Sequence, residues 1–160
     1  MTRKHTRRDF LAAAATLAAA TGMPAGVGAQ ATKDLRGTEE DMRIAIAQFT
    51  SSQPLTKGRV RLDVPPLVDN GNTVAISVAV ESPMTDADHV RAIRIFSERN
   101  PEPIILAMKL GPRAGRASVA TRVRLADTQT LVAVAEMSDG TFWFGSAPTV
   151  VTIASCLEEI

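Results

Sequence analysis

Alternation of apolar and polar residues dominates most of the chain and predicts β-strands rather than helices. Apolar residues occupy every second position in residues 74–80, and the same spacing returns in residues 60–64, 104–110 and 119–125. Turn-forming residues separate these segments, most clearly at Asp69-Asn70-Gly71-Asn72. About seven short strands of this kind predict an all-β fold, specifically an immunoglobulin-like antiparallel β-sandwich.

One segment ahead of the strands has helical spacing instead. Thr38 is followed by three acidic residues, a pattern typical of a capped helix start. Apolar residues then recur at intervals of three and four, which predicts a short N-terminal helix over residues 38–50, packed as a clasp against the sandwich. Because no internal repeat or low-complexity tract follows, residues 30–153 are predicted to form one domain. The apolar face of the helix consists of Met42, Ala45, Ile46 and Phe49.

The first 29 residues have the composition of an export signal. Basic residues precede an apolar run over residues 11–20, and small residues then allow cleavage after Ala29 or Ala31. Arg7-Arg8, shortly before an apolar pair, resembles the twin-arginine signal. The chain is therefore expected to reach the periplasm already folded, through the twin-arginine pathway, with no membrane insertion after cleavage.

Export of a folded protein usually has one of two reasons: a cofactor inserted in the cytoplasm, or a bound partner without a signal of its own. The rest of the chain contains no cofactor motif, so we expect no cofactor and a bound partner. Removal of residues 1–29 takes away four of the 18 basic and one of the 17 acidic residues, leaving 14 basic and 16 acidic residues. That balance, without a basic cluster, argues against nucleic acid as a partner.

Cys156 is the only cysteine of the chain, and it lies in a C-terminal tail, residues 154–160. A single cysteine cannot close an internal bridge, so it is an intermolecular link, a reactive thiol or a buried bystander. The acidic residues Glu158 and Glu159 just after it favour exposure. If the protein handles a reactive group, we expect Cys156 to be the residue that holds it.

Other candidates for chemistry are few. One histidine, His89, remains after removal of the signal, which excludes a zinc cluster of His and Cys, and no Gly-x-Ser-x-Gly motif supports a catalytic triad around it. Arg122 and Arg124 could bind an anion. The favoured interpretation is that these two side chains only keep the outer face of the sheet solvated. Residues 142–144, Phe-Trp-Phe, put aromatic side chains on both faces of a strand, so one face is a candidate partner-docking surface.

Five segments taken together resemble SoxY, the sulfur-oxidation carrier protein family. They occur in the family's order, the similarity covers most of residues 54–153, and the twin-arginine signal is similar too. The segments are Asp69-Asn70-Gly71-Asn72-Thr73-Val74, Ser82-Pro83-Met84-Thr85, Arg99-Asn100-Pro101, Ala120-Thr121-Arg122-Val123-Arg124-Leu125-Ala126 and Met137-Ser138-Asp139-Gly140.

The resemblance implies a periplasmic sandwich in a tight heterodimer with SoxZ, a partner that has no signal. It also implies that the C-terminal cysteine, here Cys156, covalently carries sulfur intermediates of thiosulfate oxidation. In the family a haem-containing enzyme loads thiosulfate, a hydrolase releases sulfate, and a sulfur dehydrogenase oxidises the remaining sulfur. By this resemblance the chain is a carrier protein and not an enzyme.

The tail departs from the family pattern at the residues that matter most. The family ends in Gly-Gly-Cys-Gly-Gly, whereas residues 154–158 are Ala-Ser-Cys-Leu-Glu. Glycine gives an arm its conformational range, and Glu158 and Glu159 beside the thiol are expected to raise its pKa and to repel an anionic substrate. Two hypotheses therefore stay open: a covalent sulfur carrier, and a SoxY-like binding module of another periplasmic oxidation system that carries no sulfur.

Overall fold

The computed structural model describes residues 35–153. The chain divides into two compact units, Met1–Lys33 and Asp34–Ile160, and every described residue belongs to the second unit. The predicted signal peptide and the predicted tail with Cys156 therefore lie outside the described residues. No helix within residues 35–153 combines the length and apolar character needed to cross a membrane.

Helix α2, Glu39–Thr50, confirms the helix predicted from the apolar spacing. A capping box starts it: the Thr38 hydroxyl accepts a hydrogen bond from the Asp41 N–H at 3.2 Å, and the Asp41 carboxylate accepts one from the Thr38 N–H at 2.9 Å. The helix ends at Ser51, which takes the left-handed conformation with φ of 52°.

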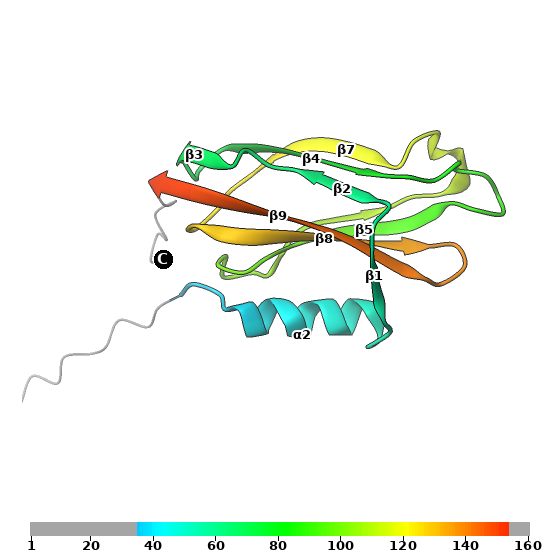
Figure 1. The fold of residues 1–160 in the computed structure, drawn as a ribbon, viewed down its shortest axis with the longest axis horizontal. Helices are drawn as coiled ribbons and strands as arrows, with labels where there is room; N and C mark the ends of the chain where they lie inside the picture. Colours follow the sequence, from blue (N-terminus) through cyan, green and yellow to red (C-terminus); the bar gives the residue numbers. More distant parts are fainter. Residues whose placement is uncertain (1–34, 154–160) are drawn as a thin grey trace, which may run out of the picture. The chain divides into compact units, whose positions relative to one another are not determined.

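Residues 35–153 contain nine strands in two sheets that pack face to face (Figure 1). The larger sheet has the order β1-β9-β8-β5-β6, with β3 paired to the C-terminal half of β9, and the smaller sheet has the order β2-β4-β7. Neighbours are antiparallel except that β1 and β3 run parallel to β9. The strands are β1 Leu55–Lys57, β2 Val60–Asp63, β3 Leu67–Asn70, β4 Val74–Val80, β5 Val90–Ser97, β6 Ile104–Lys109, β7 Ser118–Val123, β8 Gln129–Met137 and β9 Phe142–Ile153, and a 3-10 turn, η1, covers Pro112–Ala114.

The predicted immunoglobulin-like sandwich is confirmed, with more strands than the alternation predicts. β1 and β3 have only three and four residues, so neither is long enough for alternation to show. Each pairs with β9 from a distant part of the sequence, and the pairing rather than local pattern makes them strands. Both are parallel to β9, which the predicted antiparallel arrangement did not include.

β9 continues through Pro148, a residue that normally interrupts a strand. The position of Pro148 in the sheet explains why the strand tolerates it. β1 pairs with residues 142–144 of β9 and β3 with residues 150–153, so Pro148 lies in the gap between these two neighbours. The N–H of Val150, two residues further along, points to the β3 side, where it donates to Pro66 at 3.0 Å. By the same alternation the missing N–H of Pro148 would face a stretch without a paired strand.

The core lies between the two sheets and consists of the inward-facing members of the alternating pairs. In β4 the buried residues are Val74, Ile76, Val78 and Val80, the same positions that the sequence pattern predicts. They belong to one cluster with Ile93, Ile95, Leu131 and Leu125, which have no exposed surface. Burial of each such side chain contributes roughly 1.5–3 kcal/mol to the stability of the sandwich.

Helix α2 covers the outer face of the larger sheet (Figure 1). Phe49 of the helix lies 5.6 Å from Phe142 of β9 and 6.2 Å from Phe96 of β5, measured between ring centroids. The other aromatic of the triplet, Trp143, packs against the core and stacks under the Arg59 guanidinium at 5.3 Å. The helix therefore occupies the face proposed from residues 142–144 for partner docking, and that prediction is wrong.

Candidate functional site

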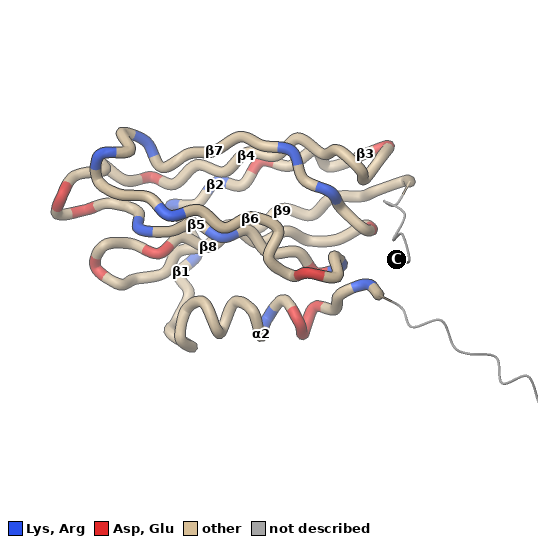
Figure 2. The backbone as a smooth tube through the Cα atoms, turned by 180° about the vertical axis from the view of Figure 1, so that it is seen from behind, with Lys and Arg blue, Asp and Glu red and all other residues tan. Residues whose placement is uncertain are grey.

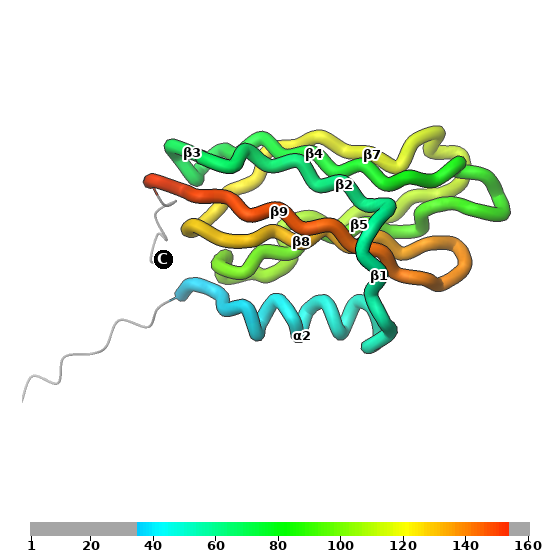
Figure 3. Tube along the Cα trace, viewed as in Figure 1, coloured from blue at the N-terminus to red at the C-terminus, as the bar shows by residue number. Residues whose placement is uncertain are grey.

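The base of the C-terminal tail is a strand held on both sides. β9 pairs with β8 as far as Thr149 and with β3 as far as its own last residue, Ile153. The Gly71 N–H donates to the Ile153 carbonyl at 2.9 Å, which extends the pairing to the final described residue. The strand that leads to Cys156 is thus fixed in place up to three residues before it (Figure 3).

Threonine hydroxyls add a second set of bonds along this half of β9. Thr149 donates to the Pro65 carbonyl at 2.7 Å, and Thr152 donates to the Asp69 carbonyl at 3.0 Å. On the opposite side the Val151 N–H donates to the Thr128 hydroxyl at 3.0 Å. These bonds satisfy backbone groups at the end of the sheet, where a strand would otherwise fray.

Exposed apolar side chains lie on β3 and on the end of β9. Leu67 and Ile153 are 60% and 62% exposed, and Val150, the register partner of Leu67, is 49% exposed. Apolar surface is therefore available next to the point where the tail leaves the sandwich.

A buried polar network lies below this end and orders its loops. The Gln129 side chain bonds the Ser97 hydroxyl and the Arg99 N–H, and its amide donates to the Asn100 side chain at 3.3 Å. Asn100 in turn joins two segments: it accepts from the Ala126 N–H at 2.9 Å and donates to the Arg124 carbonyl at 2.7 Å. The loop after β5 and the segment after β7 are thereby locked together.

The carboxylate of Asp127 adds a fixed negative charge to the same end. The Thr128 N–H, which donates to it at 2.7 Å, and the Arg36 guanidinium, also at 2.7 Å, hold the pKa of Asp127 below its usual value of 3.8, against the opposing effect of burial. Asp127 is therefore ionised at neutral pH and ties the segment before α2 to the start of β8.

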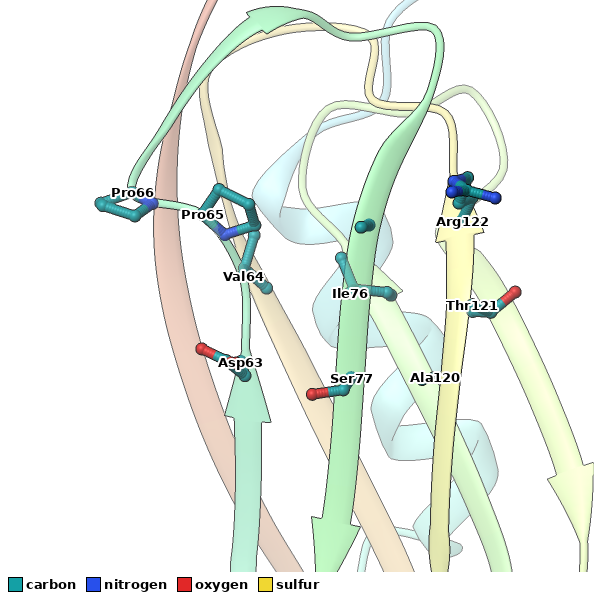
Figure 4. A pocket seen from close by; sticks show the side chains of 10 residues that line it. Asp63, Val64, Pro65, Pro66, Ile76, Ser77, Ala120, Thr121 and Arg122 are labelled. Carbon is teal, nitrogen blue, oxygen red and sulfur yellow. The ribbon is translucent and has the colours of Figure 1, made fainter.

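Several hollows lined by residues 35–153 lie at or near this end. One of about 830 Å³ lies on the outer face of the smaller sheet, where small side chains of β4 and β7 form part of its lining. Figure 4 shows Arg122 projecting from β7 on one side of it and Pro65 and Pro66 on the other, with β4 between. A second hollow, about 450 Å³, lies between the start of β6 and the end of β7, and a third, about 380 Å³, lies beside Pro148 and Val150.

The structure separates the candidate residues that the sequence singled out. The His89 ring bonds the Thr85 carbonyl through Nδ1 at 3.0 Å, and the backbone N–H of His89 donates to the Ser138 hydroxyl. His89 therefore holds two loops in place. Arg122 and Arg124 are both exposed, as expected, and both line the 450 Å³ hollow. Cys156 lies outside the described residues, so its prediction as the attachment site stays a prediction.

No three His, Cys, Asp or Glu side chains of residues 35–153 come together as a metal site. What the sequence did not reveal is the anchoring of β9 by Thr128 and Thr152, and the network around Gln129. Neither has a local signal, because each joins residues more than 20 positions apart.

Comparison with known proteins gives a consistent result. The family model of the sulfur oxidation protein SoxY matches residues 46–156, a range that ends on Cys156. A comparison with curated proteins found no match.

Two solved structures illustrate the likeness. The sulfur carrier protein SoxY from Chlorobium limicola f thiosulfatophilum superposes with a TM-score of 0.61 and 27% identity, covering 71% of this chain and 98% of that chain. A superoxide reductase (neelaredoxin) from Ignicoccus hospitalis superposes with a TM-score of 0.53 and 16% identity, covering 59% of this chain and 80% of that one, and shares the fold alone. The family match over well more than half of the residues, together with the likeness to a solved member, shows that the chain belongs to the SoxY family of sulfur oxidation proteins.

Proposed function

We propose that the protein is the sulfur carrier subunit of a periplasmic sulfur-oxidising system and holds sulfur intermediates covalently on Cys156. The observation that carries the proposal is the family match, which extends from within α2 to Cys156 itself. The fixed course of β9 supports it, because a carrier needs a firm base from which a reactive thiol can be presented to other proteins.

The chemistry of loading follows from the thiol. Joining the Cys156 thiol to thiosulfate forms a bond between Sγ and the outer sulfur of thiosulfate, giving Cys–S–S–SO₃⁻. The step releases one proton and two electrons, so it needs an oxidant, and in the family a haem-containing enzyme takes the electrons. The carrier supplies the nucleophilic sulfur, which reacts as the thiolate.

Partners and compartment complete the proposal. The twin-arginine signal supports export of a folded complex, and a signal-less SoxZ-like protein fits the role of the chain that travels with it. The client enzymes would be the haem-containing loader, a sulfate-releasing hydrolase and a sulfur dehydrogenase. The carrier itself is acted on and does not turn over a substrate.

The test is the state of the thiol in protein isolated from its own periplasm. Intact-mass and peptide mass spectrometry should find a thiosulfonate, persulfide or related adduct on Cys156, and the same measurement locates the cleavage site near Ala29 or Ala31. Cys156→Ser protein serves as the control and should have no adduct. A thiol that stays free after incubation with thiosulfate and the complete set of client enzymes would contradict the proposal.

A second candidate function rests on the tail composition. None of the four glycines that flank the family's cysteine is present in residues 154–158, which favours a SoxY-like binding module of another periplasmic oxidation system. Cys156→Ser in the native host separates the two functions. Loss of sulfur oxidation supports the carrier, whereas unchanged function with the SoxZ-like partner still bound supports the binding module.

A further inference from the structure

Two arginines at the end of β7 line a hollow close to the base of the tail. Arg122 and Arg124 border the 450 Å³ hollow together with Ile104 and Ile105 of β6 and the loop that carries Asn100. Arg122 also borders the larger hollow on the outer sheet face (Figure 4). Figure 2 shows basic positions on the β7 side of the sandwich at the end where β3 lies.

A short path of hydrogen bonds connects this hollow to the tail. The Gly71 N–H donates to the Ile153 carbonyl at 2.9 Å, and the Gly71 carbonyl accepts from the Leu125 N–H at 2.8 Å. Gly71 therefore lies between the last residue of β9 and the residue after Arg124. Since hydrogen-bonded backbone segments lie about 4.8 Å apart, two such steps through Gly71 place Ile153 and Leu125 at most roughly 10 Å apart.

The chain between Ile153 and Cys156 is long enough to cover that separation. Three residues span at most about 10 Å when extended, and the long arginine side chain extends further from the other side. Full extension of these three residues toward β7 would bring a group attached to the Cys156 sulfur near Arg124 without any movement of β9.

The backbone that carries the arginines is held in position. The Asn100 side chain donates to the Arg124 carbonyl at 2.7 Å and accepts from the Ala126 N–H at 2.9 Å, and Ala126 is buried. Antiparallel pairing to β4 fixes Arg122 opposite Ala75, a residue too small to cover it. Both guanidinium groups therefore project from a rigid support, which favours binding because little order is lost when a ligand arrives.

Their charges are also uncompensated in the described part of the chain. Within residues 35–153 neither Arg122 nor Arg124 forms an ion pair, whereas Arg43, Arg59 and Arg91 each lie within 4 Å of a carboxylate. One acid, Glu102, lines the same hollow, so the hollow keeps an excess of positive charge. Guanidinium groups bind planar and tetrahedral oxyanions through paired N–H donors, and two of them close together favour a doubly charged one.

We propose that Arg122 and Arg124 form a binding site for a sulfur oxyanion, the thiosulfate that is loaded or the sulfonate end of the adduct on Cys156. The proposal rests on the carrier function. It also resolves a conflict in the sequence, because Glu158 and Glu159 would repel an anion next to the thiol unless cations from the sandwich offset them. The fold brings Arg124 near Ile153, the last described residue of β9, through the hydrogen bonds of Gly71 to Ile153 and to Leu125.

The binding step is tested with thiosulfate itself, on the mature full-length chain carrying Cys156→Ser so that no covalent step can occur. NMR titration at low ionic strength should show saturable shifts of the Arg122 and Arg124 side-chain N–H signals. Arg122→Gln with Arg124→Gln should weaken binding by about tenfold or more, the size expected for loss of charged hydrogen bonds. Arg113→Gln with Arg116→Gln removes the same charge from an exposed loop and should leave binding within about twofold, since distant exposed charges are screened.

Two results would overturn the assignment. One is an absence of saturable shifts at Arg122 and Arg124, or an equal loss of affinity in the Arg122/Arg124 and the Arg113/Arg116 double variants. Either outcome would mean that thiosulfate is attracted only by the overall charge of the protein. Shifts of the two side chains on Glu158→Gln with Glu159→Gln, in the absence of thiosulfate, would mean that the tail carboxylates occupy the site. Neither result bears on whether wild-type Cys156 acquires an adduct, so failure of the oxyanion site and failure of the carrier function are told apart.

Discussion

Residue 145 must be glycine because β9 and β2 approach each other closely at this position. It lies in β9 where this strand passes β2, and a Cβ atom there would overlap the backbone carbonyl oxygen of Val60. Backbone atoms cannot move aside as a flexible side chain does, so the two strands would have to separate. Only glycine permits this close approach.

We expect Gly145→Ala to lower the free energy of unfolding by about 1–3 kcal/mol, the usual cost of overpacking. Gly111→Ala is the matched control, because a Cβ at Gly111 meets no atom within 4 Å and the residue has an ordinary φ of −142°. Urea unfolding of both variants measures the effect, with the control within about 0.5 kcal/mol of wild type. Equal stability of the two variants would contradict the close approach of β9 and β2.

Some residue roles follow from local sequence and others do not. Thr38 as a helix cap was predictable, because its partner Asp41 lies three positions further along the chain. Gly145 and Asn100 were not predictable, since their partners lie 85 and 24 or more positions away. A single sequence contains the residue types but not the pairings that give them their roles.

At the scale of elements, α2 depends on its capping box and makes stability sensitive to acid. The Thr38 hydroxyl and, next, the Thr38 N–H bond the Asp41 carboxylate and hold the pKa of Asp41 below its usual value of 3.8. The helix in turn covers Phe142 and Phe96. Loss of the cap therefore affects the packing of the helix on the larger sheet.

The stabilisation from Asp41 is complete above pH 3.8, the unfolded value, and is lost as pH falls through the lower pKa of the folded state. Wild type should therefore be more stable than Asp41→Asn at pH 7, and the difference should shrink as pH falls below about 4. Thermal unfolding of the two proteins from pH 7 to pH 3 measures the difference. Glu40→Gln, which removes a neighbouring first-turn acid, is the control, and an Asp41→Asn difference that stays constant with pH would contradict the role of the cap.

The strands divide by length into those that sequence reveals and those that it does not. β4, β6 and β7 have at least six residues and were predicted within two residues at each end from alternation alone. β1 and β3 owe their existence to β9, which continues through Pro148 because that residue lies in the gap between them. Short parallel partners of a distant strand have no signature of their own.

For the whole molecule, the sandwich and its helix were predictable, and so was the family, because the residue patterns agree along most of the chain. The environment of the tail base, at the end of β9, was not predictable from the sequence. Its firmness depends on the Thr128 and Thr152 hydroxyls and on Gly71, whose partners lie far away in the sequence and meet them only when β3, β8 and β9 pair.

Accessibility of the thiol is the prediction that belongs to this scale. We expect native protein to be alkylated at Cys156 by iodoacetamide at a rate close to that in urea, because the acidic residues Glu158 and Glu159 just after it favour exposure. Mass spectrometry of timed samples gives both rates. Modification that occurs only after unfolding would contradict the carrier function and leave the binding module.

β6 and β7 are the outermost strands of their sheets, and residues of both border one hollow. Each has a side on which no strand of residues 35–153 lies, so its backbone groups could pair with those of another copy. Lys109 on β6 and Arg122 on β7 are exposed there and give both edges the same sign of charge. Because like charges repel and salt screens them, we expect copies of the chain to associate edge to edge more readily as the salt concentration rises.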